Sequence, residues 1–202
     1  MTSRKAPLLC AVVILAVAVP TACLACDTAL LVIDVQNVYV RTMDLTTIDG
    51  IPLVEKLVQV LAAARAVGIP VAYIQHLDPR FAQGSPELEV DEAIAPHVGD
   101  LTVWKTTADG FWRTGLMATL RGLGVRRLLI TGLATTGCVS ATTSGAVRNG
   151  FETWVLVDAH SGGGTLDTLA YYNSTWAAVG ALGIRSDAVD FAAFGCTPTA
   201  NP

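Results

Sequence analysis

Three side chains in this sequence have the types needed for nucleophilic hydrolysis: Asp34, Lys105 and Cys138. A cysteine attacks as its thiolate, and a helix N-terminus or a neighbouring cation lowers the thiol pKa. Cys138 stands where a helix is expected to begin, and Lys105 can supply the positive charge. Asp34 can accept the thiol proton and later pass it to a leaving amine. Together these residues favour hydrolysis through a cysteine nucleophile.

Each of the three residues also has an ordinary explanation when taken alone. An aspartate after a first strand is often a helix cap or a Mg²⁺ ligand, a lysine after a strand is usually solvated, and a lone cysteine is more often a small core residue. Gly132 and Gly137 add a further feature, because glycines allow a sharp turn that exposes backbone N–H groups to an oxyanion. The hypothesis of a cysteine hydrolase therefore depends on the combination of these residues, since each has a role in the same reaction.

The elements that must position these residues are strands and helices that alternate along the chain. The patterns predict strands at 28–33, 70–75, 101–104, 125–131, 152–157 and 184–191, and helices at 52–68, 112–122, 138–149 and 166–182. This alternation predicts an α/β fold, a three-layer α/β/α sandwich with a mainly parallel six-stranded sheet. The polar, proline-containing stretch 77–99 is expected to be a long loop or lid with a short helix.

The candidate residues follow three of these strands. Ligands of open parallel sheets bind at the carboxyl ends of the strands. Asp34 follows the first predicted strand, Lys105 the third, and Cys138 lies beyond the fourth. We therefore expect all three at one edge of one sheet.

Composition excludes several classes of protein. The chain has 202 residues, with 13 Lys and Arg against 17 Asp and Glu, and a formal net charge of −4. That balance disfavours binding of nucleic acid. Hydrophobic residues make up 52% and charged residues 15%, so the chain can bury a sizeable core and is not disordered.

The N-terminal segment resembles a targeting signal. Arg4 and Lys5 precede the apolar run 8–19, Pro20 breaks it, and small residues follow up to Ala25. This pattern predicts a secretory signal peptide over residues 1–25, too short for the roughly 20 apolar residues of a spanning helix. Residues 26–202 would then form one domain of an exported protein, secreted or periplasmic. If the segment is instead a buried or frayed helix, or is never translated, the protein is expected in the cytoplasm.

The positions of the cysteines do not predict a definite set of disulfides. Cys10 and Cys23 would leave with the signal. Residues 24–26 also resemble the end of a bacterial lipoprotein signal with Cys26 as the lipid-bearing residue, although Cys23 stands where an aliphatic residue is preferred. Membrane contact is expected only through such an anchor. A disulfide framework is not indicated, but Cys26 could pair with Cys196 after export.

Three sequence blocks resemble the isochorismatase-like cysteine hydrolases. They are Ala-Leu-Leu-Val-Ile-Asp-Val-Gln-Asn around Asp34, Lys-Thr-Thr-Ala-Asp-Gly-Phe from Lys105, and Ile-Thr-Gly-Leu-Ala-Thr-Thr-Gly-Cys-Val-Ser-Ala-Thr around Cys138. The resemblance extends from residue 28 to about residue 189. It implies that Asp34, Lys105 and Cys138 are a catalytic triad. It also implies a cis peptide between Leu133 and Ala134, with the N–H groups of Ala134 and Cys138 as an oxyanion hole.

Departures from the family pattern narrow the expected chemistry. Isochorismatases that cleave a vinyl ether commonly lack the cysteine, so Cys138 argues for C–N hydrolysis of a small amide, carbamoyl or ureido compound. The pattern therefore points toward the N-carbamoylsarcosine amidase and ureidoacrylate hydrolase side of the family. Nicotinamidases hold a metal through an Asp and several His after the first strand, but residues 38–50 contain no His. His76 could match one ligand, yet a polar strand-end role is preferred. We expect no metal, no cofactor and a homo-oligomer.

Four residues are candidates for substrate binding: Gln36, Tyr39, Phe111 and Trp112. The three aromatic side chains could equally belong to the core. The alternative function is a non-catalytic protein on the same fold that binds a small molecule or a partner, which a broken triad would support. A thiol oxidoreductase is a second alternative, but it normally needs a resolving cysteine, and Cys196 at the far C-terminus is a poor candidate.

Overall fold

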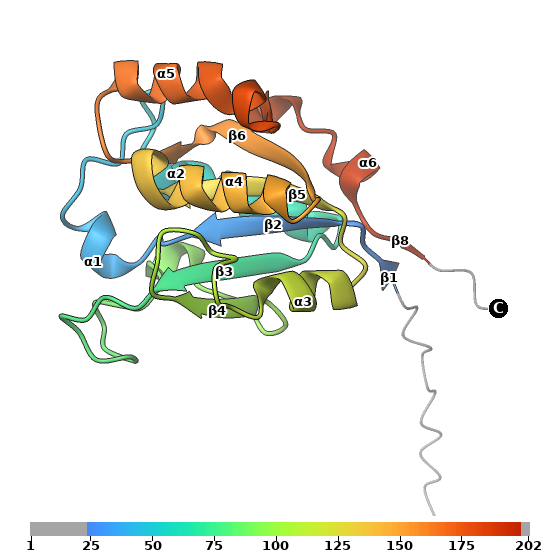
Figure 1. The fold of residues 1–202 in the computed structure, drawn as a ribbon, viewed down its shortest axis with the longest axis horizontal. Helices are drawn as coiled ribbons and strands as arrows, with labels where there is room; N and C mark the ends of the chain where they lie inside the picture. Colours follow the sequence, from blue (N-terminus) through green and yellow to red (C-terminus); the bar gives the residue numbers. More distant parts are fainter. Residues whose placement is uncertain (1–23, 199–202) are drawn as a thin grey trace, which may run out of the picture.

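The sheet is the centre of the molecule and is parallel throughout. The computed structural model describes residues 24–198, in which six strands pair in the order β4-β3-β2-β5-β6-β7, every neighbouring pair being parallel (Figure 1). Helices cover both faces, because right-handed crossovers that run in opposite directions along the sheet place their helices on opposite faces (Figure 1). The predicted three-layer α/β/α sandwich is confirmed.

The elements that build these layers have the following bounds. The strands of the sheet are β2 (Thr28–Ile33), β3 (Val71–His76), β4 (Leu101–Lys105), β5 (Arg127–Leu133), β6 (Glu152–Ser161) and β7 (Leu182–Ile184). The α-helices are α1 (Asn37–Val40), α2 (Leu53–Ala66), α3 (Leu116–Gly122), α4 (Ser140–Arg148), α5 (Leu166–Thr175) and α6 (Phe191–Phe194). Shorter helical turns are η1 (Glu92–Ile94), η2 (Thr135–Val139), η3 (Trp176–Val179) and η4 (Ser186–Ala188).

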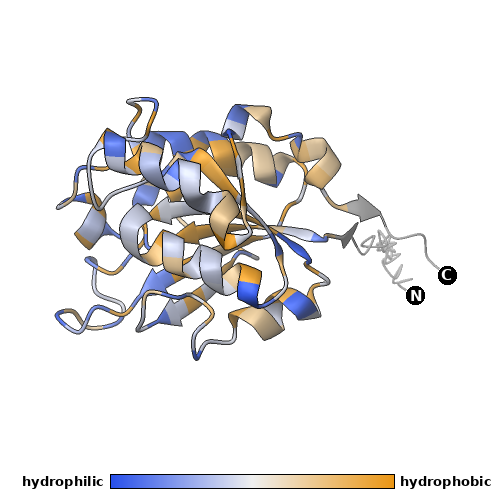
Figure 2. Ribbon diagram, turned by 45° about the horizontal axis from the view of Figure 1, so that its top comes forward, coloured by the Kyte–Doolittle hydropathy of each residue, from blue (hydrophilic) through white to orange (hydrophobic). Residues whose placement is uncertain are grey.

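Strand β2 shows why the sheet has two cores. Its six residues are all buried, because alternate side chains enter opposite hydrophobic layers. Leu30 and Val32 pack in the layer that contains the buried face of α2. Leu31 and Ile33 pack in the layer that contains α3 and α4 residues. Figure 2 shows the hydrophobic colour concentrated on the central strands, with hydrophilic residues on the outer helices and loops.

The strand order reverses at β2, where the functional residues were expected. From β2 the chain continues to β3 and β4 on one side, and then crosses to β5 on the other side. A parallel sheet forms a crevice at such a switch point, outside the carboxyl ends of the two strands. The crevice here lies between the end of β2 and the end of β5.

Several element boundaries differ from the sequence prediction. The predicted last strand at 184–191 is wrong: β7 spans Leu182–Ile184 and is followed by η4 and α6. The predicted helix at 166–182 ends early, because Gly180 takes a left-handed conformation with φ of 83°. The predicted helix at 112–122 begins only at Leu116, and β6 continues to Ser161.

The two ends of the described chain lie together. β1 (Leu24–Ala25) pairs antiparallel with β8 (Thr197–Pro198), and a disulfide joins Cys26 to Cys196 with their Cα atoms 4.4 Å apart. The predicted signal peptide lies outside the described residues except for its last two positions. Among residues 24–198, no helix is both long and apolar enough to cross a membrane.

Peptide mapping tests this pairing. Digestion of the alkylated, unreduced protein is expected to yield a fragment that joins the peptides of Cys26 and Cys196, while Cys138 carries the alkyl label. Reduction before alkylation should release the two peptides, each labelled. A lipid or an alkyl group on Cys26 in the unreduced protein would contradict the pairing.

Candidate active site

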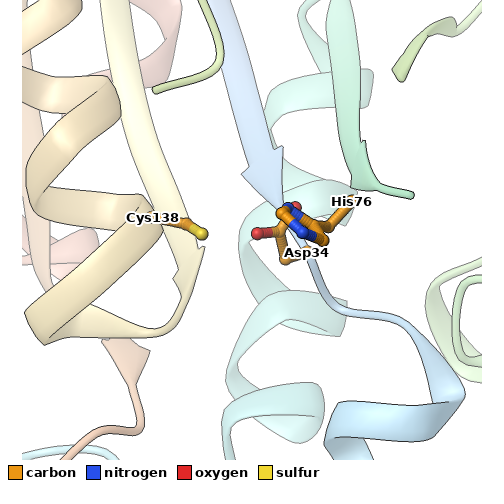
Figure 3. A group of neighbouring side chains, drawn as sticks. All are labelled: Asp34, His76 and Cys138. Carbon is orange, nitrogen blue, oxygen red and sulfur yellow. The ribbon is translucent and has the colours of Figure 1, made fainter. Parts of the chain in front are cut away.

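The predicted catalytic residues come together at the carboxyl edge of the sheet. Asp34 directly follows β2 and has a positive φ of 54°, Lys105 is the last residue of β4, and Cys138 lies in η2 beyond β5. His76, the last residue of β3, joins them. Figure 3 shows the Cys138 sulfur facing Asp34 and His76 across the crevice.

Lys105 is the hub of this group. Its Nζ donates to Asp34 Oδ2 at 2.7 Å and to Cys138 Sγ at 3.2 Å, and it lies 3.1 Å from His76 Nδ1. An ammonium group has three N–H donors and no acceptor, so these three contacts use its full capacity. The Lys105 side chain is fully buried, and the side chain of Asp34 is 3% exposed. Lys105 is therefore a buried charge whose three donors all face acceptors of the protein.

The register of the sheet makes these contacts possible. His76 pairs with Lys105 across β3 and β4, and Ile33, which precedes Asp34, pairs with Gly132 across β2 and β5. The three strand ends on one side of the crevice are consecutive neighbours in the sheet. A shift of one residue in either pair would turn the side chains to opposite faces.

The pKa of the Cys138 thiol differs from the sequence prediction. A lowered pKa was expected from a helix N-terminus and a nearby cation. Instead, burial and the Asp34 carboxylate outweigh the opposing effect of Lys105 and raise the pKa of Cys138 to about 12. Cys138 also lies in the single π-helical turn η2, and α4 begins only at Ser140. At neutral pH Cys138 is therefore a thiol that needs a base.

Asp34 has the properties of such a base. Burial raises the pKa of its carboxyl group, although Lys105 opposes the shift, and a raised pKa makes the carboxylate a stronger base. Oδ2 accepts from Lys105, whereas the buried Oδ1 has no hydrogen-bond partner among the described residues. A buried acceptor of this kind is costly unless it meets a donor during function.

His76 is a member of the site that sequence analysis assigned to an ordinary strand end. Because the Lys105 ammonium can only donate, His76 Nδ1 must accept, and the histidine proton then resides on Nε2. Burial and the Lys105 charge both lower the pKa of His76, which favours the neutral ring. The signal that could have found this residue is its place at the end of the strand between those of Asp34 and Lys105.

Asp34, His76 and Cys138 could in principle hold a metal ion, since their ligand atoms lie within 4.8 Å of one another. However, these same three residues already contact Lys105 Nζ. A cation placed among them would have to displace the ammonium or share its neighbours at short range. The donor set therefore fits a lysine-centred site better than a metal centre.

The turn after β5 holds the predicted oxyanion-hole residues. The peptide bond between Leu133 and Ala134 is cis, as the family resemblance implies. The Ala134 carbonyl accepts from the N–H groups of Gly137 and Val139, whereas the Ala134 N–H meets no acceptor among the described residues. Ala134 and Cys138 both line the pocket at the site.

This pocket has a volume of about 170 Å³ and is lined by Asp34, Tyr39, Met43, His76, Leu133, Ala134 and Cys138. Tyr39 is the candidate substrate-binding residue that the structure places here. Burial, together with the nearby carboxylates, raises the pKa of Tyr39 to about 12, so its phenol stays neutral. Met43 was not predicted, because nothing in the sequence indicates that the segment after α1 folds back over the strand ends.

The structure places the other three candidate substrate-binding residues outside the lining of this pocket. Gln36 is fully buried and its amide binds backbone: Oε1 accepts from His76 N–H, and Nε2 donates to the Leu88 carbonyl. Phe111 packs in the core against Phe151, with ring centroids 5.6 Å apart. Trp112 is 58% exposed and lies under the guanidinium of the next residue, outside the pocket lining.

The chain is similar in sequence and in fold to known proteins. The Isochorismatase domain model matches residues 28–178. The chain is 31% identical over 178 residues to the ureidoacrylate amidohydrolase RutB of Methylorubrum extorquens, covering 69% of this chain and 72% of the relative. The crystal structure of N-carbamoylsarcosine amidase from Thermoplasma acidophilum superposes with a TM-score of 0.68 at 27% identity, covering 81% of this chain and 99% of that one. An isochorismatase family protein from Desulfovibrio vulgaris has the same fold, with a TM-score of 0.73 at 24% identity over 82% of this chain and 97% of that one.

Alkylation of Cys138 tests the electrostatics of the site. Lys105→Ala removes a cation that lowers the thiol pKa, so iodoacetamide should react more slowly than with the wild type at about pH 8. Asp34→Asn removes an anion that raises this pKa, so alkylation should be faster. Mass spectrometry of the Cys138 peptide against time gives both rates.

Circular dichroism of both variants is the control for this experiment, because Lys105→Ala leaves the Asp34 carboxylate buried without its partner. Equal alkylation rates in the wild type and two folded variants would show that neither charge acts on the thiol.

Chelation tests the assignment of the central cation. Because Lys105 Nζ contacts the three possible ligand residues, dialysis against EDTA is expected to leave hydrolytic activity unchanged. Metal content before and after dialysis, measured by plasma mass spectrometry, is the control. Activity that is lost on chelation and restored by Zn²⁺ or Fe²⁺ would contradict a lysine-centred site.

Proposed function

The chain belongs to the isochorismatase family of hydrolases, and we propose that it cleaves a C–N bond of a small amide, carbamoyl or ureido compound through a covalent Cys138 intermediate. One observation carries the proposal: a single buried ammonium contacts both the nucleophile and its base, at 3.2 Å and 2.7 Å. The relatives named for ureidoacrylate and N-carbamoylsarcosine cleavage support C–N hydrolysis as the reaction.

The first half of the reaction forms an acyl-enzyme. Asp34 accepts the thiol proton as Cys138 Sγ attacks the substrate carbonyl carbon, and the carbonyl oxygen becomes an oxyanion. The N–H groups of Ala134 and Cys138 are the donors proposed to bind this oxyanion. Collapse of the tetrahedral intermediate breaks the C–N bond, and the amine leaves with the proton that Asp34 held. A thioester, or a thiocarbamate when the substrate is a carbamoyl or ureido compound, remains on Cys138.

The second half regenerates the thiol. Asp34, again a carboxylate, takes a proton from water as the water oxygen attacks the thioester carbonyl. The resulting intermediate expels the Cys138 sulfur, which recovers its proton from Asp34, and an acid or a carbamate is released. Lys105 does not transfer a proton in this scheme. Its fixed charge stabilises the negative charge on whichever of Asp34 and Cys138 carries it.

The size of the pocket limits the substrate. A volume of about 170 Å³ accommodates only a small molecule, well below the roughly 300–1,000 Å³ of sites for drug-sized ligands. Tyr39, Met43 and Leu133 supply mostly apolar walls, so the part of the substrate beside the reacting carbonyl should be compact. These features favour short amides and carbamoyl compounds over peptides.

Substitution of the nucleophile tests the proposal. Ammonia release from a panel of short amides, N-carbamoyl amino acids and ureidoacrylate identifies a substrate, on which Cys138→Ala should lower kcat by at least about 10⁴-fold. Ser144→Ala, in α4 and outside the pocket lining, is the matched control and should keep wild-type activity. Near-wild-type turnover by folded Cys138→Ala would overturn the assignment of the nucleophile.

A further inference from the structure

A buried hydrogen-bonded chain links the oxyanion turn to α5, and the proposed reaction does not use it directly. Thr135 Oγ1 lies 2.8 Å from His160 Nδ1, and His160 Nε2 lies 2.8 Å from Asn173 Oδ1. Thr135 and His160 are both fully buried. We propose that His160 and Thr135 are positioning residues that hold the Ala134 N–H in place for the oxyanion, an inference that rests on the proposed cysteine mechanism.

The contacts of Asn173, at the far end of this series of hydrogen bonds, fix which group donates in each of them. Asn173 Nδ2 donates to the Val157 carbonyl at 2.9 Å, and Trp176 Nε1 donates to Asn173 Oδ1 at 3.0 Å. The Asn173 oxygen is therefore the acceptor that faces His160, so His160 carries its proton on Nε2. His160 Nδ1 must then accept the Thr135 hydroxyl proton. The direction of the whole chain is fixed.

The environment keeps His160 in this one state. Burial lowers the pKa of His160 to about 4, so the ring stays neutral at ordinary pH. The ring also packs edge-on against Trp176, with centroids 5.7 Å apart. A rigid neutral histidine with a defined tautomer is a suitable anchor for a loop.

The position of Thr135 explains what this anchor controls. Thr135 directly follows Ala134, and its own N–H donates to the Gly162 carbonyl at 3.1 Å. Its side chain and backbone are thus both tied to the end of β6 and the residue after it. His160 does not line the pocket, so its side chain acts through the groups it touches, and the Thr135 hydroxyl is the one of these that adjoins Ala134. Loss of the bond would leave the peptide plane that presents the Ala134 N–H less well defined, and small misplacements of this kind are costly in catalysis.

Aldehyde binding measures the oxyanion site without needing the natural substrate. The Cys138 thiol adds across the carbonyl of propionaldehyde: an S–C bond forms, the C–O π bond breaks, and the thiol proton ends on the oxygen. That oxygen occupies the place of the substrate oxyanion, and bound aldehyde protects Cys138 from iodoacetamide. Alkylation without aldehyde reports the thiol alone. The ratio of the alkylation rates with and without aldehyde therefore isolates the contribution of the oxyanion site to aldehyde binding.

Variants at Thr135 separate the hydroxyl from the rest of the side chain. Thr135→Val removes the donor with little change of shape, and aldehyde affinity should fall about tenfold, less than the roughly 10²–10³-fold effect of deleting an oxyanion donor. Thr135→Ser keeps the hydroxyl and should keep the affinity. Thr153→Val is the matched control, because its buried hydroxyl donates to the Phe151 carbonyl at the amino end of β6, away from the oxyanion turn.

Variants at His160 separate its two nitrogens. His160→Asn can place an oxygen near the position of Nδ1 and should preserve much of the affinity, whereas His160→Gln reaches the position of Nε2 and should lose about as much as Thr135→Val. On a substrate found in the amide panel, the affected variants should show a lower kcat at similar KM. The rate of alkylation without aldehyde should stay within about twofold of the wild type throughout, because the anchor acts on the oxyanion site rather than on the thiol.

Several results would overturn the inference. These are unchanged aldehyde affinity in folded Thr135→Val and His160→Gln, an equal loss in Thr153→Val, a parallel fall in alkylation without aldehyde, or no aldehyde binding by the wild type. If no amide is cleaved but aldehyde affinity follows the expected pattern, the proposed hydrolysis fails and the positioning role stands.

Discussion

The structure of the site depends on one buried ammonium group. Removing a lysine charge from water is expensive unless acceptors replace the lost hydration. Lys105 meets this requirement with a carboxylate, an imidazole nitrogen and a sulfur, contributed by Asp34, His76 and Cys138. Each acceptor comes from the end of a different strand or from the turn that follows it. The ammonium therefore requires four segments of chain to be in register at once, and its neighbours cannot be moved independently.

The parallel sheet meets this requirement through close backbone packing at its centre. Gly132 lies opposite Ile33 in the β2–β5 pair and has a φ of 113°, in the region that favours glycine. A Cβ atom at this position would collide with the Ile33 carbonyl oxygen. The glycine allows β5 to turn beside the end of β2, and this turn brings Cys138 to the same side as Asp34. Close approach of the two strands and close approach of the nucleophile to its base have the same cause.

Asp34, Lys105 and Cys138 meet at one edge of the sheet, as the sequence predicted, but the sequence did not predict everything around them. Strand ends are visible in the sequence because buried runs such as that of β2 are continuous and apolar. The roles of Gln36 and Phe111 depend instead on which distant backbone or ring they meet, and no local pattern records such contacts. The sign of the thiol pKa shift was wrong for a similar reason. Spacing indicated a helix start and a cation, whereas the dominant effect is the burial of Cys138 together with Asp34.

The raised thiol pKa is compatible with the proposed mechanism because the same cation stabilises the negative charge on either member of the proposed pair, Asp34 and Cys138. Before proton transfer the negative charge resides on Asp34, 2.7 Å from Lys105 Nζ; after transfer it resides on Cys138 Sγ, 3.2 Å from the same nitrogen. The charge thus moves between two positions around a fixed counter-ion, with little reorganisation of the surroundings. If Asp34 and Cys138 were ionised together, two negative charges would lie beside one ammonium, and the described pocket lining supplies only neutral side chains apart from Asp34 itself. One ammonium shared between two acidic groups therefore favours a resting thiol that ionises as it attacks.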